Sequence, residues 1–132
     1  MQAWIGIWTL SAIVASASPT APRVYTRGTR QIQVSDSGVT ITDNLVRIRG
    51  GVVHLEWTGK IDGGDYPVQG VEVFLTSAYR QLDDHTLELT QRLDGRIVVR
   101  ARLVLSADGK AITTTTTDGV TTATTVYSKR SS

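Results

Sequence analysis

Four acidic turn signals divide the C-terminal half of the chain, residues 77–129, into short segments. The segments are rich in Leu, Val, Ile, Thr and Tyr, and the signals between them are Asp83-Asp84, Asp94-Gly95, Asp108-Gly109 and Asp118-Gly119. Asp and Gly adopt the backbone conformations that tight hairpin turns require, so the pattern is typical of antiparallel strands joined directly to one another. It predicts a β-meander.

Residues 96–105 show the alternation that a half-buried strand requires. One face carries Ile97, Val99, Ala101, Leu103 and Leu105, whereas the other carries Arg96, Val98, Arg100, Arg102 and Val104. Residues 87–93 alternate in the same way, and the threonine run 113–117 is β-branched, which suits a pleated surface better than a helix.

The N-terminal half reads as further strands of the same kind. The predicted strands are 4–10, 30–35, 39–42, 52–61, 65–68 and 73–82, and residues 11–22, with Pro19 and Pro22, are predicted to form a loop. Together with the second half this gives about nine or ten strands and no helix. Successive hairpins without a long crossover favour a closed up-and-down β-barrel of about 8–10 strands over a sandwich, because closure removes the exposed edges.

Length and composition exclude several classes of protein. The 132 residues predict one domain over 1–132, and the absence of cysteine excludes a disulfide scaffold or a thiolate metal site. The formal net charge is only +2, with basic and acidic residues interleaved, which argues against a nucleic-acid partner. No apolar segment reaches the length of a membrane span, and nothing indicates a cofactor.

Residues 3–17 have two interpretations. They are mostly apolar and end in Ala15-Ser16-Ala17, as a signal peptide does, but no Lys or Arg precedes them. Two tryptophans flank Gly6 in residues 4–10, which favours a first strand of the barrel over a removable signal.

Several stretches resemble a known family. Gly6-Ile7-Trp8 resembles the G-x-W motif of the lipocalin and fatty-acid-binding-protein superfamily, and residues 60–68, 82–88, 106–110 and 126–129 are similar to small bacterial lipocalin-like proteins. The resemblance implies a ligand-carrying barrel, a structural role for Gly6 and Trp8 at one barrel end, and an exported or periplasmic protein, although this chain shows no separate export signal.

One departure from that family bears on the ligand. Fatty-acid-binding proteins commonly hold a carboxylate with an Arg-x-Tyr pair on the last strand, and the matching positions here are Thr125-Val126-Tyr127. The tyrosine is present and the arginine is absent, which argues against that mode of carboxylate recognition. Arg100 and Arg102 point outward in an ordinary small barrel. In a wider barrel with a polar interior they would replace the missing arginine as anion anchors, beside Trp57, Tyr79 and Tyr127 as apolar walls with polar tips.

Other polar groups are better explained as surface features. His54 and Glu56 share one strand face, but two ligands without a third make a poor metal site. Asp83-Asp84-His85 reads as a polar turn, and so do Asp62, Asp65 and Glu72, which lack the spacing of a calcium loop.

The sequence thus favours a non-catalytic binding module for a small apolar or amphipathic ligand. Its candidate binding residues are Trp57, Tyr79, Arg100, Arg102 and Tyr127. The alternative is a structural or protein-interaction barrel with a filled core and no ligand. An enzyme ranks third, because no catalytic constellation is present. The oligomeric state is left open.

Overall fold

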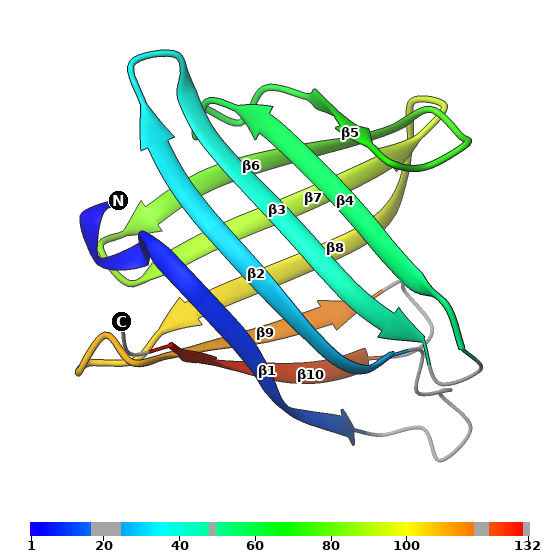
Figure 1. Ribbon diagram of the computed structural model, residues 1–132. Helices are drawn as coiled ribbons and strands as arrows, with labels where there is room; N and C mark the ends of the chain where they lie inside the picture. Colours follow the sequence, from blue (N-terminus) through cyan, green and yellow to red (C-terminus); the bar gives the residue numbers. More distant parts are fainter. Residues whose placement is uncertain (17–24, 48–49, 118–121, 131–132) are drawn as a thin grey trace.

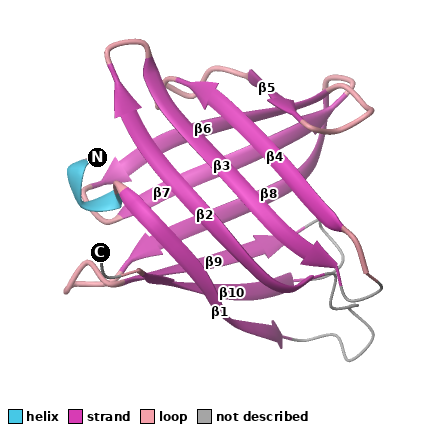
Figure 2. Cartoon of the chain, viewed as in Figure 1, coloured by secondary structure: helices cyan, strands magenta, loops and turns pink. Residues whose placement is uncertain are grey.

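The computed structural model of the protein describes residues 1–16, 25–47, 50–117 and 122–130. In this part of the chain, ten antiparallel strands form a closed barrel in which each strand pairs with its neighbours in sequence, and the last pairs with the first (Figures 1 and 2). The strands are β1 (Gly6–Ser16), β2 (Tyr25–Ser35), β3 (Gly38–Arg47), β4 (Val52–Gly59), β5 (Tyr66–Gln69), β6 (Leu75–Asp83), β7 (Thr86–Leu93), β8 (Arg96–Leu105), β9 (Ala111–Thr117) and β10 (Thr122–Lys129). The predicted all-β up-and-down barrel is confirmed.

The predicted turns are found where the sequence placed them. Asp94 and Gly95 both have positive φ, 49° and 84°, as a tight turn between twisted strands requires. At the β6–β7 turn, the Asp83 carboxylate accepts a 2.8 Å hydrogen bond from the His85 backbone N–H. The Asp118-Gly119 signal lies outside the described residues.

The first strand differs from the prediction at both ends. It begins at Gly6 rather than residue 4, because residues Gln2–Trp4 form a single 3-10 turn, η1, that buries Trp4. It continues to Ser16, through part of the predicted loop, because the second half of β1 pairs with β10 from Ala12↔Val126 to Ser16↔Thr122. A register shift between Leu10 and Ala12 separates the two halves. Closing the barrel therefore needs a longer first strand than the apolar pattern indicated.

A second irregularity changes one face of β8. The register passes from Gln91↔Val99 to Arg92↔Ile97, so Val98 is an extra residue on β8. A β-bulge of this kind reverses the side to which the following positions point. Ile97 is consequently 44% exposed instead of sharing the buried face of Leu103 and Leu105, as the simple alternation predicted.

The short strand β5 is the weakest part of the wall. It pairs with β4 and with β6 at two residues each, and Pro67 lies within it. Proline lacks a backbone N–H, so it is tolerated where few ladder hydrogen bonds form. Within the described residues, no helix has the length and apolar character to cross a membrane.

Candidate functional site

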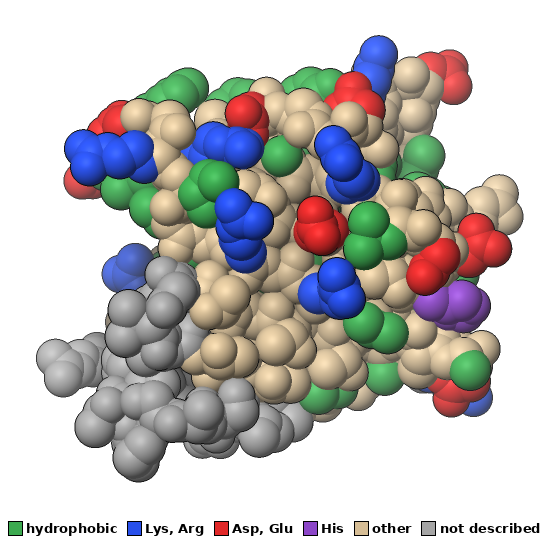
Figure 3. Space-filling view, turned by 180° about the vertical axis from the view of Figure 1, so that it is seen from behind, with side chains coloured by type: hydrophobic (Ala, Val, Ile, Leu, Met, Phe, Trp, Pro, Cys, Tyr) green, Lys and Arg blue, Asp and Glu red, His purple; other side chains and the backbone are tan. Residues whose placement is uncertain are grey.

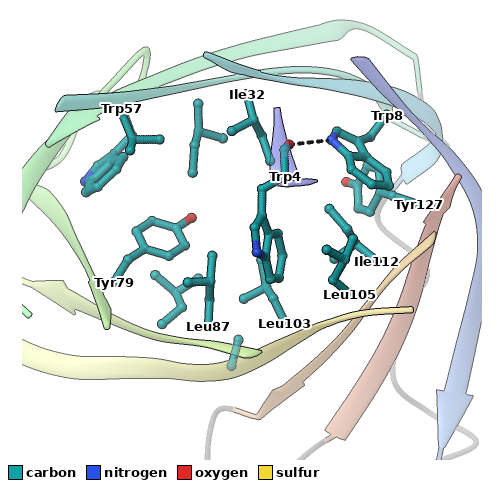
Figure 4. Close-up of a cluster of buried hydrophobic side chains, with 14 residues drawn as sticks. Trp4, Trp8, Ile32, Trp57, Tyr79, Leu87, Leu103, Leu105, Ile112 and Tyr127 are labelled. Atoms are coloured by element: carbon teal, nitrogen blue, oxygen red, sulfur yellow. Dashed lines mark hydrogen bonds between the residues drawn. The ribbon is translucent and has the colours of Figure 1, made fainter. Parts of the chain in front are cut away.

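The interior of the barrel is sealed at the end that carries η1. Inward-facing side chains there are almost completely buried and pack around Trp4, whose ring points into the barrel (Figure 4). The members with less than 2% exposure are Trp4, Trp8, Leu87, Leu103, Leu105 and Ile112. Each buried aliphatic side chain of this set contributes about 1.5–3 kcal/mol to folding. This end is a packed core and leaves no room for a ligand.

Gly6 and Trp8, for which a structural role was expected, lie in this sealed end. The Trp8 indole N–H donates a 3.0 Å hydrogen bond to the Trp4 carbonyl, and the Lys129 ammonium lies 5.4 Å from the Trp8 ring centre. Gly6 has φ of 145°, and a Cβ there would sit 3.0 Å from the Lys129 side chain. Both positions are therefore adapted to close packing around Trp4 and Lys129.

A charged pair lies inside the barrel next to this core. Arg30 on β2 and Asp43 on β3 are cross-strand partners and face inward. The Arg30 Nε donates to Asp43 Oδ1 at 2.7 Å, and Nη2 donates to Oδ2 at 3.3 Å. Their side chains are only 15% and 14% exposed. Burial acts to lower the pKa of Arg30, but Asp43 and the nearby Tyr127 and Tyr79 outweigh it and raise that pKa, so the guanidinium stays charged.

The three aromatic residues predicted to line the ligand site all face inward and lie near this pair. The Arg30 guanidinium lies over the Tyr127 ring, with its carbon atom 4.9 Å from the centre of that ring. Trp57 and Tyr79 meet edge to face at 4.7 Å between ring centres, and the Trp57 indole N–H is held by the Ser77 carbonyl at 3.0 Å. The three are 4–6% exposed, so their rings form part of the inner wall at this level.

Tyr79 also presents a hydroxyl for which the described residues provide no hydrogen-bond partner. Within the described part of the chain it makes no hydrogen bond, although the residue is only 5% exposed. Burial raises the pKa of Tyr79 to about 12, with Asp43 and Tyr127 adding to the shift and Arg30 opposing it. The hydroxyl is therefore a neutral donor at ordinary pH. Thr114 on β9 has a fully buried hydroxyl without a partner among the described residues. Such groups are uncommon in protein interiors and call for an explanation.

Beyond this polar level lies the half of the interior that we call the open half, because its inward-facing side chains are less buried. Inward-facing residues of the far half of the strands are only half-buried, in contrast to the sealed end. They are mostly apolar: Val53, Leu55, Leu75, Leu93, Val99, Thr116 and Ala123. The barrel is thus closely packed at one end, polar in the middle and lined at the other end by less buried, mostly apolar side chains.

The two arginines predicted as possible interior anchors are outside the barrel. Arg100 and Arg102 are exposed, because Ala101 and Leu103 occupy the inward positions of β8. Arg102 lies 3.9 Å from Glu88. The alternative in which they replace the missing arginine inside a wide barrel is therefore wrong, and the outward orientation expected of an ordinary barrel is found.

Arg100 and Arg102 border a hollow of about 410 Å³ on the outer face of β7–β9, together with Glu88, Thr113 and Thr115. The polar groups of this hollow, Glu88, Arg100 and Arg102 among them, are exposed to solvent. Seen from behind, the molecular surface carries basic, acidic and apolar side chains intermixed (Figure 3). The partly buried polar groups inside the barrel are the better candidate site, because desolvated groups bind with more discrimination than solvated ones.

The remaining polar candidates occupy surface positions. His54 is exposed, and its Nδ1 is 2.6 Å from the Asn44 amide oxygen. Asp62 accepts hydrogen bonds from the Gly64 N–H and the Tyr66 hydroxyl, and the first of these, with Tyr66 and Lys60 adding, lowers the pKa of Asp62. Asp65 pairs instead with Arg92 at 2.6 Å. Among the described residues, no group of three potential metal ligands comes together.

Sequence reasoning missed Arg30 and Asp43. A signal for them existed, since the turn at residues 36–37 pairs Ile32 with Ile41 and thereby places Arg30 opposite Asp43. Both residues lie two positions from a buried isoleucine on the same face of their strands, and opposite charges at matching positions of a hairpin indicate a cross-strand pair.

Comparisons with known proteins identify the type of fold. No protein-family model and no curated protein matches the chain. Among solved structures, the chain is similar to the fluorescent protein UnaG, with a TM-score of 0.65, 14% identity and 98% coverage of both chains. It is also similar to fatty-acid-binding protein 1 of Echinococcus granulosus, with a TM-score of 0.64, 13% identity and coverage of 99% of this chain and 100% of the other. The fatty acid transporter REP1-NXSQ aligns over 97% and 96% with a TM-score of 0.65 and 10% identity. At these identities the likeness shows the fold, which is a lipocalin and fatty-acid-binding-protein-like barrel.

Proposed function

We propose that the protein is a non-catalytic carrier that binds one small apolar or amphipathic molecule in the open half of its barrel. The observation that carries the proposal is the contrast within the interior, where the Trp4 end is sealed and the opposite end is lined by half-buried inward side chains such as Val53, Leu75 and Val99. Ligand sites in small barrels are concave, mostly apolar and equipped with a few polar groups, and this interior has those three properties.

The structural neighbours support the proposal without identifying a ligand. The names of two of them refer to fatty-acid binding and fatty-acid transport, and neither is named as an enzyme. The residues at the site also lack a nucleophile next to a base, which acid–base or covalent catalysis requires. Trp57, Tyr79 and Tyr127 keep their proposed roles as binding residues, whereas Arg100 and Arg102 drop out of the interior site.

The test is binding of Nile red, an uncharged dye whose emission shifts to the blue in apolar surroundings. We expect saturable binding at one dye per chain. Val99→Trp fills the open half from its inward position on β8 and should weaken dye binding at least about tenfold, equivalent to about 1.4 kcal/mol. Val104→Trp is the matched control, because Val104 lies on the outer face of the same strand, is 42% exposed and should leave the affinity unchanged.

The alternative is a structural or protein-interaction barrel whose core is completely filled, and the dense packing around Trp4 and Trp8 favours it for one end of the barrel. Under that alternative Nile red shows no saturable binding, or the two tryptophan variants affect it equally. Native mass spectrometry gives an independent readout, since a carrier purified with its ligand shows a discrete mass increment over the denatured chain.

A further inference from the structure

The polar level of the barrel contains a small chamber. Its volume is about 70 Å³, and its polar lining comprises Arg30, Asp43, Ser77, Tyr79, Gln91 and, on the outer side of the wall between β4 and β5, Glu56. The remaining walls are apolar and include Trp57 and Leu89. A water molecule occupies about 30 Å³ of liquid, so the chamber accommodates roughly two waters or one compact polar group. It is too small for a hydrocarbon chain, which belongs in the open half.

The positive charge of Arg30 in this chamber is already compensated by Asp43. Asp43 engages the Nε and Nη2 edge of Arg30, the two-point contact that a ligand carboxylate would otherwise make. A ligand anion would have to displace Asp43 or lie beside its carboxylate at low dielectric, where like charges repel strongly. The Tyr127 ring covers one face of the guanidinium and further limits approach. The arginine therefore helps to shape the chamber without leaving a net positive charge in it.

The chamber contains both hydrogen-bond donors and an acceptor that are available to a ligand. The Tyr79 hydroxyl is a donor with no partner among the described residues, and the Arg30 Nη1 is not engaged by Asp43. The Gln91 side-chain nitrogen donates to the Ser77 hydroxyl at 3.1 Å, which directs the amide and leaves its oxygen as an acceptor. A group that enters this chamber thus meets donors and an acceptor but no uncompensated positive charge, and the Glu56 carboxylate in the lining adds a negative one.

We infer that the chamber receives the head group of the carried ligand, and that this head is an uncharged donor–acceptor group such as a primary amide or a hydroxyl rather than a carboxylate. The inference rests on the proposed carrier function and specifies its ligand class. Asp43 is the residue that disfavours carboxylates, and Tyr79 is a residue that recognises the neutral head. An acceptor on the head satisfies the Tyr79 hydroxyl, and a donor on the head satisfies the Gln91 oxygen.

The test uses three probes that share one hydrocarbon chain, lauramide, lauryl alcohol and laurate, each competing with Nile red near pH 8, where the carboxylate is ionised. We expect the wild-type chain to bind lauramide at least about tenfold more tightly than laurate, a difference of about 1.4 kcal/mol. Asp43→Asn removes the competing carboxylate while keeping the side-chain shape, and it should reverse the order, so that laurate binds more tightly than lauramide.

Because Asp43→Asn leaves Arg30 without its counter-charge and can prevent folding, Tyr79→Phe provides a second variant. It removes only a hydroxyl that has no hydrogen-bond partner in the described part of the chain, so circular dichroism should show an unchanged fold. We expect the lauramide affinity to fall about fivefold or more with little change for Nile red. Tyr66→Phe is the matched control, because its hydroxyl bonds to Asp62 on the exposed surface, and it should leave all three affinities unchanged.

The outcomes separate the two proposals. Binding of laurate by the wild-type chain as tightly as lauramide overturns the neutral-head inference while the carrier function stands. An unchanged lauramide affinity in Tyr79→Phe also overturns it. Absence of saturable binding by Nile red and by all three probes overturns the carrier function, and the head-group inference with it.

Discussion

The buried pair of Arg30 and Asp43 allows a quantitative prediction. Removing one partner of a buried ion pair leaves an uncompensated charge and costs about 3–5 kcal/mol, whereas replacing both by apolar residues of similar size is close to neutral. Since the two side chains are still about 15% exposed, some solvent reaches them, and we expect the lower end of the range. Arg30→Met and Asp43→Leu should each cost about 3 kcal/mol, and the double variant should lie within about 1 kcal/mol of the wild-type stability.

The assay is urea unfolding followed by tryptophan fluorescence, which reports on the fold because Trp4, Trp8 and Trp57 are 0–4% exposed. A loss of 3 kcal/mol moves the midpoint by roughly 2 M urea in a domain of this size. The surface pair Glu88 and Arg102, with atoms 3.9 Å apart and side chains about half exposed, is the matched control and should contribute less than about 0.5 kcal/mol. Additive single-variant effects, with the double variant about 6 kcal/mol less stable, would refute the reasoning, because the two charges would then be independent of each other.

Three further predictions concern single positions. The raised pKa of Tyr79 means that the folded chain keeps a proton between about pH 10 and pH 12 that the unfolded chain loses. The free energy of unfolding should therefore fall by roughly 2–3 kcal/mol as the pH rises across that window. Urea unfolding of Tyr79→Phe at the same pH values should show a smaller fall, because this contribution is missing. Gly70→Ala should destabilise by more than about 3 kcal/mol, because its Cβ would lie 2.1 Å from the His54 carbonyl oxygen. Gly50→Ala, also at positive φ but with nothing within 4 Å, should cost about 1–2 kcal/mol, and equal midpoints for these two variants would contradict the steric explanation. Trp4→Ala should cost about 3–5 kcal/mol by leaving a cavity at the sealed end, which thermal unfolding measures; a cost below about 1 kcal/mol would show that η1 is not part of the core.

The parts of the fold that depend on local signals could be predicted from the sequence. Asp94-Gly95 and Asp108-Gly109 mark turns by their backbone preferences, and the alternation around Leu103 identifies a buried face, because both effects act over a few residues. With successive turns of this kind, the order of the strands follows directly.

The parts of the fold that depend on distant partners could not be predicted from the sequence. The extension of β1 to Ser16 is fixed by pairing with β10, more than a hundred residues away in sequence, and the bulge at Val98 is fixed by the register with β7. Arg30 was not singled out from the sequence, since arginine is rarely buried, and only the hairpin register reveals Asp43 as its partner. The sequence therefore named the inward aromatic residues Trp57, Tyr79 and Tyr127 but missed the charged pair beside them.

The pairing of β1 with β10 also has a consequence for the synthesis of the protein. The Ser11 hydroxyl donates to the Val126 carbonyl across a sequence separation of 115 residues, so the wall is incomplete until β10 has left the ribosome. A nascent chain that ends before Thr122 has two unpaired edges, on β1 and β9, and such edges pair readily with other chains. Pairing of β10 thus decides between a closed barrel and aggregation, and a stalled ribosome or a truncating mutation before the end of β10 would release an edge-exposed sheet instead of a weakened barrel.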